Sequence, residues 1–320
     1  MRGTLVALGG NALQRAGGAG DIAEARRHLR SVAETLVEVA RDGDALAITH
    51  GNGPQVGQLL RQNELAEREV PVRPLDVLGA ETQAQIGYLI VQELERALLR
   101  ARLPRSVLVF VSRMEVAARD PAFRQPSKPV GRFYTDAEAR PLRKRTGWTL
   151  AYDGARGGWR RVVASPRPVR WLEAEAVRTL LGRSWGNRIV PVVAGGGGAP
   201  VVRDRGGGYR GVEAVVDKDR GAAVVAAALG ADTLAIVTDV PGIAVGFGRR
   251  WERWLAEVSA EELARHAANG EFAAGSMGPK VEAILEFLRE GGRRGVVCDV
   301  PSLRRALRGD AGTRVERGRL

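Results

Sequence analysis

Short apolar runs alternate along this chain with longer segments of helical spacing. Runs of three to five mostly apolar residues predict strands at Thr4–Leu8, Ala45–Thr49, Val107–Val111, Ile189–Val193, Leu234–Thr238, Gly295–Cys298 and Thr313–Val315. Apolar residues at helical spacing or in alanine-rich stretches predict helices over residues 21–41, 55–69, 79–101, 173–181, 218–229, 260–269, 277–289 and 301–308. In the first helix the expected buried side is Ile22, Leu29, Val32, Leu36 and Val39. Such alternation favours an α/β fold with a mainly parallel sheet covered on both faces.

The pattern changes between about residues 116 and 168. Proline, glycine, arginine and aromatic residues dominate there, and no amphipathic helix of ordinary length is predicted. Arg161–Ala164 and Val169–Leu172 are predicted to pair as a hairpin. We interpret the segment as a small inserted subdomain or lid within a single domain spanning residues 1–320.

Bulk properties narrow the class of protein. The 320 residues suffice for a large core, and 44% are hydrophobic. No apolar run is long enough to cross a membrane, and the first residues lack the layout of a signal peptide, so we expect a cytoplasmic protein without membrane contact. Cys298 is the single cysteine, which excludes an internal disulfide.

The formal net charge is +12, which is compatible with nucleic-acid binding or with diffuse arginine usage. The arginines are spread over every segment, and the few aromatic residues do not interleave with them. We therefore expect no nucleic-acid partner, although a positive field attracts small anions.

Lysine is scarce, because only four of the 49 basic residues are lysines. Lys144 lies between two arginines and is expected on the surface, whereas Lys128, Lys218 and Lys280 lie in sequence rich in glycine, proline or aspartate. A lysine retained against this bias is a candidate for a site that needs a compact ammonium group.

Four predicted strands end in polar, mostly glycine-rich turns: Gly9-Gly10-Asn11, Gly51-Asn52-Gly53, Gly195–Gly198 and Thr238-Asp239. Ligands of open parallel sheets bind at the carboxyl ends of the strands, where glycines let backbone N–H groups approach an anion. The four loops together predict a site for phosphate or carboxylate groups.

The P-loop pattern is absent, so another arrangement must stabilise a phosphoryl group. Phosphoryl transfer requires positive charge around the moving group and little covalent chemistry. Lys128, Lys218 and Lys280 would supply this charge if their loops converge. Asp217 and Asp219 would orient Lys218 and approach a phosphate-bound Mg²⁺ through water.

The histidines and the cysteine offer weaker candidates. His50 follows a strand into the Gly51 loop and is expected to hydrogen-bond there, while His28 and His266 are expected to be structural or surface residues. No metal site is predicted from three scattered histidines. Cys298 lies in an apolar run and is interpreted as a core thiol.

These motifs occur in one order along nearly the whole chain. They are residues 7–13, 49–57, 74–77 with 79–80, 85–88, 128–131 with 133–134, 160–163 with 165–166, 211–219 and 275–282. In this order they resemble the carbamate kinases of the amino-acid kinase superfamily, and the motifs at 49–57 and 275–282 are the most specific.

The resemblance implies a three-layer sandwich with a mainly parallel sheet of about eight strands, a protruding subdomain and a homodimer. It also implies ATP or ADP with Mg²⁺ as cofactors, the metal being held mainly by nucleotide phosphates. Carbamate or carbamoyl phosphate would then bind at Gly9, Gly10, Asn11, Gly51, Asn52 and Gly53. By the same analogy Lys128, Lys218 and Lys280 neutralise the transferring phosphoryl group, and Asp219 holds Lys218.

The nucleotide side is implied at Asp217, Thr238, Asp239, Ala244, Gly275, Ser276 and Met277, with Met277 near the base. Residues 239–246 depart from the family pattern, because Ala244 stands about where a tyrosine is expected. The sequence therefore leaves nucleotide preference open.

Two alternatives remain beside this interpretation. One is another amino-acid kinase that acts on a carboxylate or phosphonate, and the other is a non-catalytic or nucleic-acid-binding protein. The Lys128 loop and the 49–57 motif disfavour the first, and the set of lysines disfavours the second. The direction of the reaction is also open, since the enzyme could make ATP, as in fermentative arginine breakdown, or make carbamoyl phosphate.

Overall fold

A computed structural model describes residues 3–10, 21–42, 45–154, 156–182, 188–273 and 275–318. Its centre is an eight-stranded sheet with the order β15-β17-β16-β12-β1-β2-β9-β3. The strands, in that order, are Glu257–Ser259, Thr313–Glu316, Arg294–Asp299, Thr233–Thr238, Gly3–Leu8, Ala45–His50, Ile189–Val192 and Ser106–Val109. Every neighbouring pair is parallel except β16 and β17. The expected fold class is confirmed.

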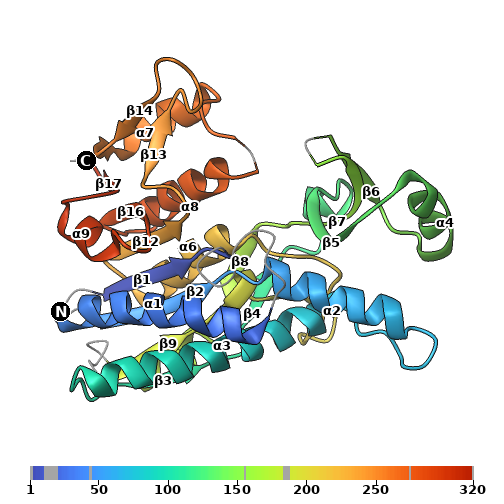
Figure 1. The fold of residues 1–320 in the computed structure, drawn as a ribbon, viewed down its shortest axis with the longest axis horizontal. Coiled ribbons are helices and arrows are strands. Elements are labelled where there is room, and N and C mark those ends of the chain that lie inside the picture. The colour runs from blue at the N-terminus through green and yellow to red at the C-terminus, as the bar shows by residue number, and fades with distance from the viewer. Residues whose placement is uncertain are drawn as a thin grey trace.

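Helices cover both faces of this sheet (Figure 1). The helices of the described residues are α1 (Ile22–Arg41), α2 (Gly53–Ala66), α3 (Leu75–Arg100), α4 (Asp136–Thr146), α5 (Ala174–Leu181), α6 (Lys218–Leu229), α7 (Ala260–Ala268), α8 (Met277–Arg289) and α9 (Leu303–Arg308). Of these, α1, α3 and α9 pack on one face, and α5, α6, α7 and α8 pack on the other. The result is a sandwich of three layers.

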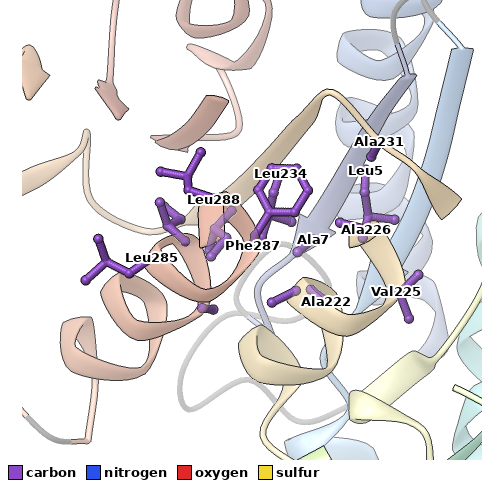
Figure 2. Close-up of a cluster of buried hydrophobic side chains, with 14 of the residues drawn as sticks. Leu5, Ala7, Ala222, Val225, Ala226, Ala231, Leu234, Leu285, Phe287 and Leu288 are labelled. Atoms are coloured by element: carbon purple, nitrogen blue, oxygen red, sulfur yellow. The ribbon is translucent and has the colours of Figure 1, made fainter. Parts of the chain in front are cut away.

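The alternation of side chains along each strand divides the core in two. In β1, Leu5 and Ala7 belong to the cluster under α6 and α8, whereas Val6 and Leu8 belong to the cluster under α1 and α3. Figure 2 shows the first cluster, in which Leu5 and Ala7 lie with Ala222 of α6 and Phe287 of α8. Strands buried on both faces explain why these runs are apolar throughout.

Two helix starts follow from short-range chemistry. Asp21 precedes α1 and accepts a hydrogen bond from the backbone N–H of Ala23. Asp217 caps α6 in the same way, and Gly230 ends that helix in the left-handed conformation with φ of 68°.

The expected burial of Ile22 is wrong, since its side chain is 44% exposed in the first turn of α1, while Val37 and Ala40 are buried instead.

Smaller sheets flank the central one. Strands β11 (Tyr209–Gly211), β10 (Ala199–Arg203), β4 (Arg113–Val116) and β8 (Pro168–Trp171) form a four-stranded sheet, and β13 (Ile243–Val245) pairs with β14 (Arg253–Leu255). The short 3-10 helices η2 (Pro121–Phe123) and η3 (Gly195–Gly197) lie between strands.

The segment from Lys128 to Val163 forms a separate layer that projects from the body (Figure 1). Its strands β5 (Lys128–Tyr134), β7 (Gly158–Val163) and β6 (Leu150–Asp153) pair in that order. Helix α4 packs on this sheet over a small core of Tyr134, Ala139, Leu142 and Leu150.

Two sequence predictions for this region are wrong. A helix of 11 residues is present, α4, which the apolar pattern did not reveal because only Ala139 and Leu142 are buried. The hairpin between residues 161–164 and 169–172 does not form, since β7 pairs with β5 and β6 whereas β8 pairs with β4. The two segments therefore end up in different sheets.

Candidate active site

The four polar strand ends lie next to one another. Strands β12, β1, β2 and β9 are consecutive neighbours in the central sheet, and each is followed by one of the loops singled out in the sequence. Their parallel direction brings all four loops to the same edge. The backbone N–H of Gly9 donates to the carbonyl of Val237, and the N–H of Gly51 donates to the carbonyl of Leu8, both at 2.9 Å.

Glycine is required where these loops touch. A Cβ on Gly51 would lie 3.2 Å from the backbone nitrogen of Gly10 and 3.5 Å from the side chain of Lys218. Gly196 has φ of 65°, and a Cβ there would lie 2.2 Å from the amide nitrogen of Asn52. The loops after β1, β2 and β9 thus meet at the start of α6.

A cavity of about 300 Å³ opens above this meeting point. Its lining contains 11 of the residues predicted for the site: Gly10, Gly51, Asn52, Gly53, Lys128, Asp217, Lys218, Asp219, Gly275, Ser276 and Lys280. Arg160, Gly196 and Pro129 also line it. The first turns of α2, α6 and α8 all contribute to the wall, so three helix N-termini face the space.

The three lysines converge on two carboxylates. Lys218 Nζ lies 2.5 Å from Asp219 Oδ1, and Lys280 Nζ lies 3.1 Å from Asp219 Oδ2. Lys128 Nζ, which comes from the projecting layer, lies 2.7 Å from Asp217 Oδ2. The scarcity of lysine thus identified three side chains that the fold places around one cavity.

Asp217 both caps helix α6 and binds a lysine in this cluster. Its Oδ1 accepts hydrogen bonds from the N–H groups of Asp219 and Arg220, and its Oδ2 takes the ammonium group of Lys128. Burial by itself would raise the pKa of this carboxyl, but the charge and hydrogen bond of Lys128 hold the pKa below its usual value. Asp217 is therefore ionised at neutral pH and fixes the first turn of α6.

His50 is a buried side chain that contacts the loop after β2. Its Nδ1 lies 3.0 Å from the carbonyl oxygen of Gly51, as expected, and its ring is fully buried. Burial lowers the pKa of His50 to about 4, the hydrogen bond to Gly51 opposes this, and the charge of Lys218 adds to it. The ring is neutral at pH 7, so Nδ1 donates to the carbonyl. A Cβ on Gly195 would lie 2.4 Å from this ring, which explains the glycine.

The remaining predicted site residues lie outside the cavity lining. Thr238 donates to Asp239 beyond the end of β12, and Ala244 is buried in β13 opposite Trp254. Met277 starts α8 but packs on the core, and Gly9 lies at the end of β1. Asn11 falls outside the described residues.

Sequence reasoning did not select Arg160 as a site residue. In the sequence Arg160 belongs only to the matching stretch 160–163, because one arginine among so many carries no signal of its own. The glycines of η3 were recognised as a loop, but their contact with Asn52 depends on the pairing of β2 with β9.

The described residues offer no dedicated metal centre. No group of three or more histidine, cysteine, aspartate or glutamate side chains is placed to hold an ion in the ranges that the structure covers. Asp217 and Asp219 are the carboxylates of the cavity, and both are paired with lysines. This donor set fits an ion held by the ligand and contacted through water.

A larger cavity, of about 1220 Å³, lies elsewhere, between β8, α5, α6 and α8. Ala223, Ala227 and Trp171 line it together with Glu175 and Glu290. It contains none of the convergent lysines and glycine-rich loops, so the smaller cavity is the candidate active site.

An α/β sandwich with a cationic, glycine-walled cavity at its strand ends is the architecture of a phosphotransferase site, and comparison with known proteins agrees. The model of the amino acid kinase family matches residues 3–299. The carbamate kinase of Pyrococcus horikoshii is 41% identical over 313 residues, which cover 97% of this chain and 98% of that protein. The carbamate kinase of Halobacterium salinarum is 45% identical over 321 residues, covering 98% of each.

A solved structure agrees as well. The carbamate kinase of Giardia lamblia bound to AMP-PNP superimposes with a TM-score of 0.92, at 36% identity and 99% coverage of both chains. The chain belongs to the amino acid kinase family and, within it, to the carbamate kinases, which are phosphotransferases. No helix in the described ranges is long and apolar enough to cross a membrane.

Proposed function

We propose that this chain transfers a phosphoryl group reversibly between carbamoyl phosphate and ADP on one side and carbamate and ATP on the other. The observation that carries the proposal is the convergence of Lys128, Lys218 and Lys280 on Asp217 and Asp219 in one cavity. Its supports are the identity with curated carbamate kinases over the full length and the AMP-PNP bound by the relative from Giardia.

The chemistry needs positioning and charge rather than a base. In the direction of ATP synthesis, a β-phosphate oxygen of ADP attacks the phosphorus of carbamoyl phosphate, and the bonding pair of the broken P–O bond stays on the carbamate oxygen. Attacking and leaving oxygens are both anionic, so no proton has to move. Accordingly, no histidine lines the cavity among the described residues.

The lysines supply the charge in this scheme. Lys128, Lys218 and Lys280 neutralise the oxygens of the moving phosphoryl group, and Asp219 keeps Lys218 and Lys280 a fixed distance apart. In the ligand-free protein the two aspartates compensate part of this charge. Asp217 and Asp219 would hold a Mg²⁺ ion through water, and that ion would supply further positive charge to the nucleotide phosphates.

The two sides of the cavity define the two substrates. Gly10, Gly51, Asn52 and Gly53, at the first turn of α2, would bind the carbamoyl or carbamate part, with Gly9 and Asn11 completing that loop. Gly275 and Ser276 would contact the nucleotide, and Thr238, Asp239, Ala244 and Met277 would extend that side towards the base.

We further propose that residues 116–168 form an inserted subdomain that closes the cavity. The layer of β5, β7, β6 and α4 has its own small core, and it brings Lys128 into the site. Its contacts with the body include the ion pairs of Lys128 with Asp217, of Arg161 with Glu213 and of Arg132 with Glu64. Closure of this layer would exclude water from the phosphoryl group.

A homodimer is also part of the proposal. Within the described residues, strand β3 is one of the two edge strands of the central sheet, the other being β15, and an edge strand can pair with another chain. Leu108 and Val111 at this edge are 38% and 50% exposed, and Tyr88 on the adjacent α3 is 58% exposed. Two copies of the chain could cover these apolar side chains with one another.

A coupled assay tests the activity. Purified protein with Mg²⁺-ADP and carbamoyl phosphate should form ATP at neutral pH. We expect the enzyme to act in the cytoplasm. Lys218→Ala should lower kcat roughly a hundredfold or more, since losing one group that stabilises transferring charge costs about 3 kcal/mol. Lys218→Arg should not restore the rate, because a planar fork does not replace a point charge.

Lys144→Ala is the matched control, since Lys144 is exposed on α4 and lies outside the cavity lining. Equal turnover of Lys218→Ala and the control would remove Lys218 from the mechanism. A folded wild-type protein that binds nucleotide but forms no ATP would contradict the substrate and would direct the assay to carboxylate and phosphonate acceptors.

A further inference from the structure

Arg160 is a fourth cationic side chain in the lining of the cavity, and the scheme above leaves it without a role. It lies in β7, on the projecting layer that also carries Lys128. One guanidinium nitrogen donates to the carbonyl of Gly131 at 3.0 Å, and the guanidinium lies 5.0 Å from the centre of the Phe133 ring. Both contacts hold the side chain in one place.

The charge of Arg160 is compensated only in part, by the longer-range attraction of Asp153. Within the described part of the chain it makes no ion pair, and its buried Nε has no hydrogen-bond partner. Its neighbour Arg161 behaves differently, because Arg161 lies 2.7 Å from Glu213 and stacks on Trp148. The three cavity lysines form ion pairs with Asp217 or Asp219. Arg160 is therefore the cationic side chain of the lining that has no ion pair with a described residue in the ligand-free protein.

A cation in this state is costly unless something binds it. Burial lowers the pKa of Arg160 and the charge of Arg156 lowers it further, whereas the charge of Asp153 opposes them, and the guanidinium stays protonated. An unpartnered buried N–H also loses the hydrogen bond that it would make with water. A protein that keeps such a group next to an anion-binding cavity gains if the ligand supplies the missing acceptor.

The anchor of Arg160 places it near one end of the cavity. Gly131, which accepts its hydrogen bond, packs on the first turns of α2, since a Cβ on Gly57 would lie 3.8 Å from Gly131 Cα. That helix begins at Gly53, on the side assigned above to the small substrate. The Gly275 loop, assigned to the nucleotide, starts a different helix, α8.

We propose that Arg160 binds the small anionic substrate, pairing its free N–H groups with oxygens of carbamate or of carbamoyl phosphate. A planar fork suits the paired oxygens of a carboxylate-like or phosphate group, which a lysine would hold less specifically. Arg160 is thus a binding and specificity-determining residue contributed by the projecting layer. This assignment rests on the proposed function of the same cavity.

The test compares Arg160→Gln and Arg160→Lys with Arg140→Gln, a control at an exposed arginine of α4 outside the cavity. In the ATP-forming assay, Arg160→Gln should raise the KM for carbamoyl phosphate about 10- to 100-fold, the usual effect of losing a charged hydrogen bond. The KM for ADP should stay within about twofold of wild type. Arg160→Lys should fall between, and the control should match wild type.

Two further measurements identify the oxygens involved. If Arg160 holds the phosphoryl group, Arg160→Gln will also lose the thermal stabilisation that inorganic phosphate gives the wild-type protein. If it holds the carbamate part, phosphate will still stabilise the variant, and the KM for carbamate, supplied as ammonium and bicarbonate, will rise instead. Either result supports the proposal.

Other outcomes overturn it. A purely structural arginine would lower the melting temperature of both variants and leave the KM for carbamoyl phosphate within twofold of wild type. If wild type forms no ATP, the proposed function fails, but phosphate stabilisation that disappears in Arg160→Gln would still support the anion site. If phosphate stabilises neither protein and no ATP forms, both proposals fail together.

Discussion

Two aspartates fix the positions of the three lysines around the cavity. Asp219 forms ion pairs with Lys218 and Lys280. Asp217 caps α6 and forms an ion pair with Lys128. The sequence pointed to Lys128, Lys218 and Lys280, because lysine is rare in this chain. It could not point to Arg160, because its place in the cavity lining and its unpartnered Nε follow only from the fold.

His50 gives this arrangement a measurable pH dependence. The unfolded chain protonates this side chain near pH 6.5, whereas burial holds the folded pKa at about 4. Between these values the unfolded state binds more protons, so stability falls as the pH drops through this window. The full shift corresponds to about 3 kcal/mol. Urea unfolding should show that the free energy of unfolding of wild type falls between pH 7 and pH 4. In His50→Gln the fall should be smaller by about 3 kcal/mol.

His28→Gln is the control for this measurement, since His28 lies on α1 beside Glu24 and away from the cavity. It should keep the wild-type dependence of stability on pH. Parallel curves for wild type and His50→Gln would show that burial of His50 contributes nothing to acid sensitivity.

At the scale of helices and strands, periodicity was a good guide where an element packs on the central sheet. Helices α6 and α8 begin and end where their spacing predicts, and the strands differ by one or two residues. The projecting layer was harder to predict, because α4 has few buried residues, β5 contains a proline and a glycine, and β6 has only four residues. Its one local signal was the capping box of Thr135 and Glu138.

The packing of α6 on η3 offers a test at this scale. Gly221 lies in the turn after Lys218, and a Cβ there would lie 2.8 Å from Gly197 Cα, so Gly221→Ala must push the helix from the loop. We expect a loss of about 1–3 kcal/mol in stability from this overpacking. Because Lys218 moves with the helix, kcat should also fall at least tenfold.

Gly79→Ala is a matched control inside another helix, α3, where an added Cβ meets no atom within 4 Å. It should be neutral or stabilising by about 0.5–1 kcal/mol. Unfolding curves and turnover of the two variants separate the effects. Unchanged kcat in Gly221→Ala would mean that the lysine tolerates displacement of its helix.

At the scale of the whole molecule, the sequence pattern and the strand topology agree on a single sandwich. The four loops after β12, β1, β2 and β9 were each unremarkable in the sequence. Their value came from the order of the strands, which depends on long-range pairing and cannot be read from any local window.

The exposed edge at β3 leads to a prediction for the assembled protein. Sedimentation at micromolar concentration should give the mass of two chains, and Val111→Asp should shift the mass towards one, since a charge in an apolar interface is unfavourable. Val169→Asp, which changes an exposed valine of β8, is the control and should sediment like wild type. A wild-type mass of one chain would contradict the homodimer.

The near absence of lysine has a practical consequence for chemical labelling. Three of the four ε-amines in this protein belong to a single cavity, and the fourth, Lys144, lies exposed on α4. Replacing Lys144 by arginine would leave a chain in which every ε-amine reports on that cavity. Acylating reagents, usually too promiscuous to be informative, would then footprint ligand occupancy in this protein directly.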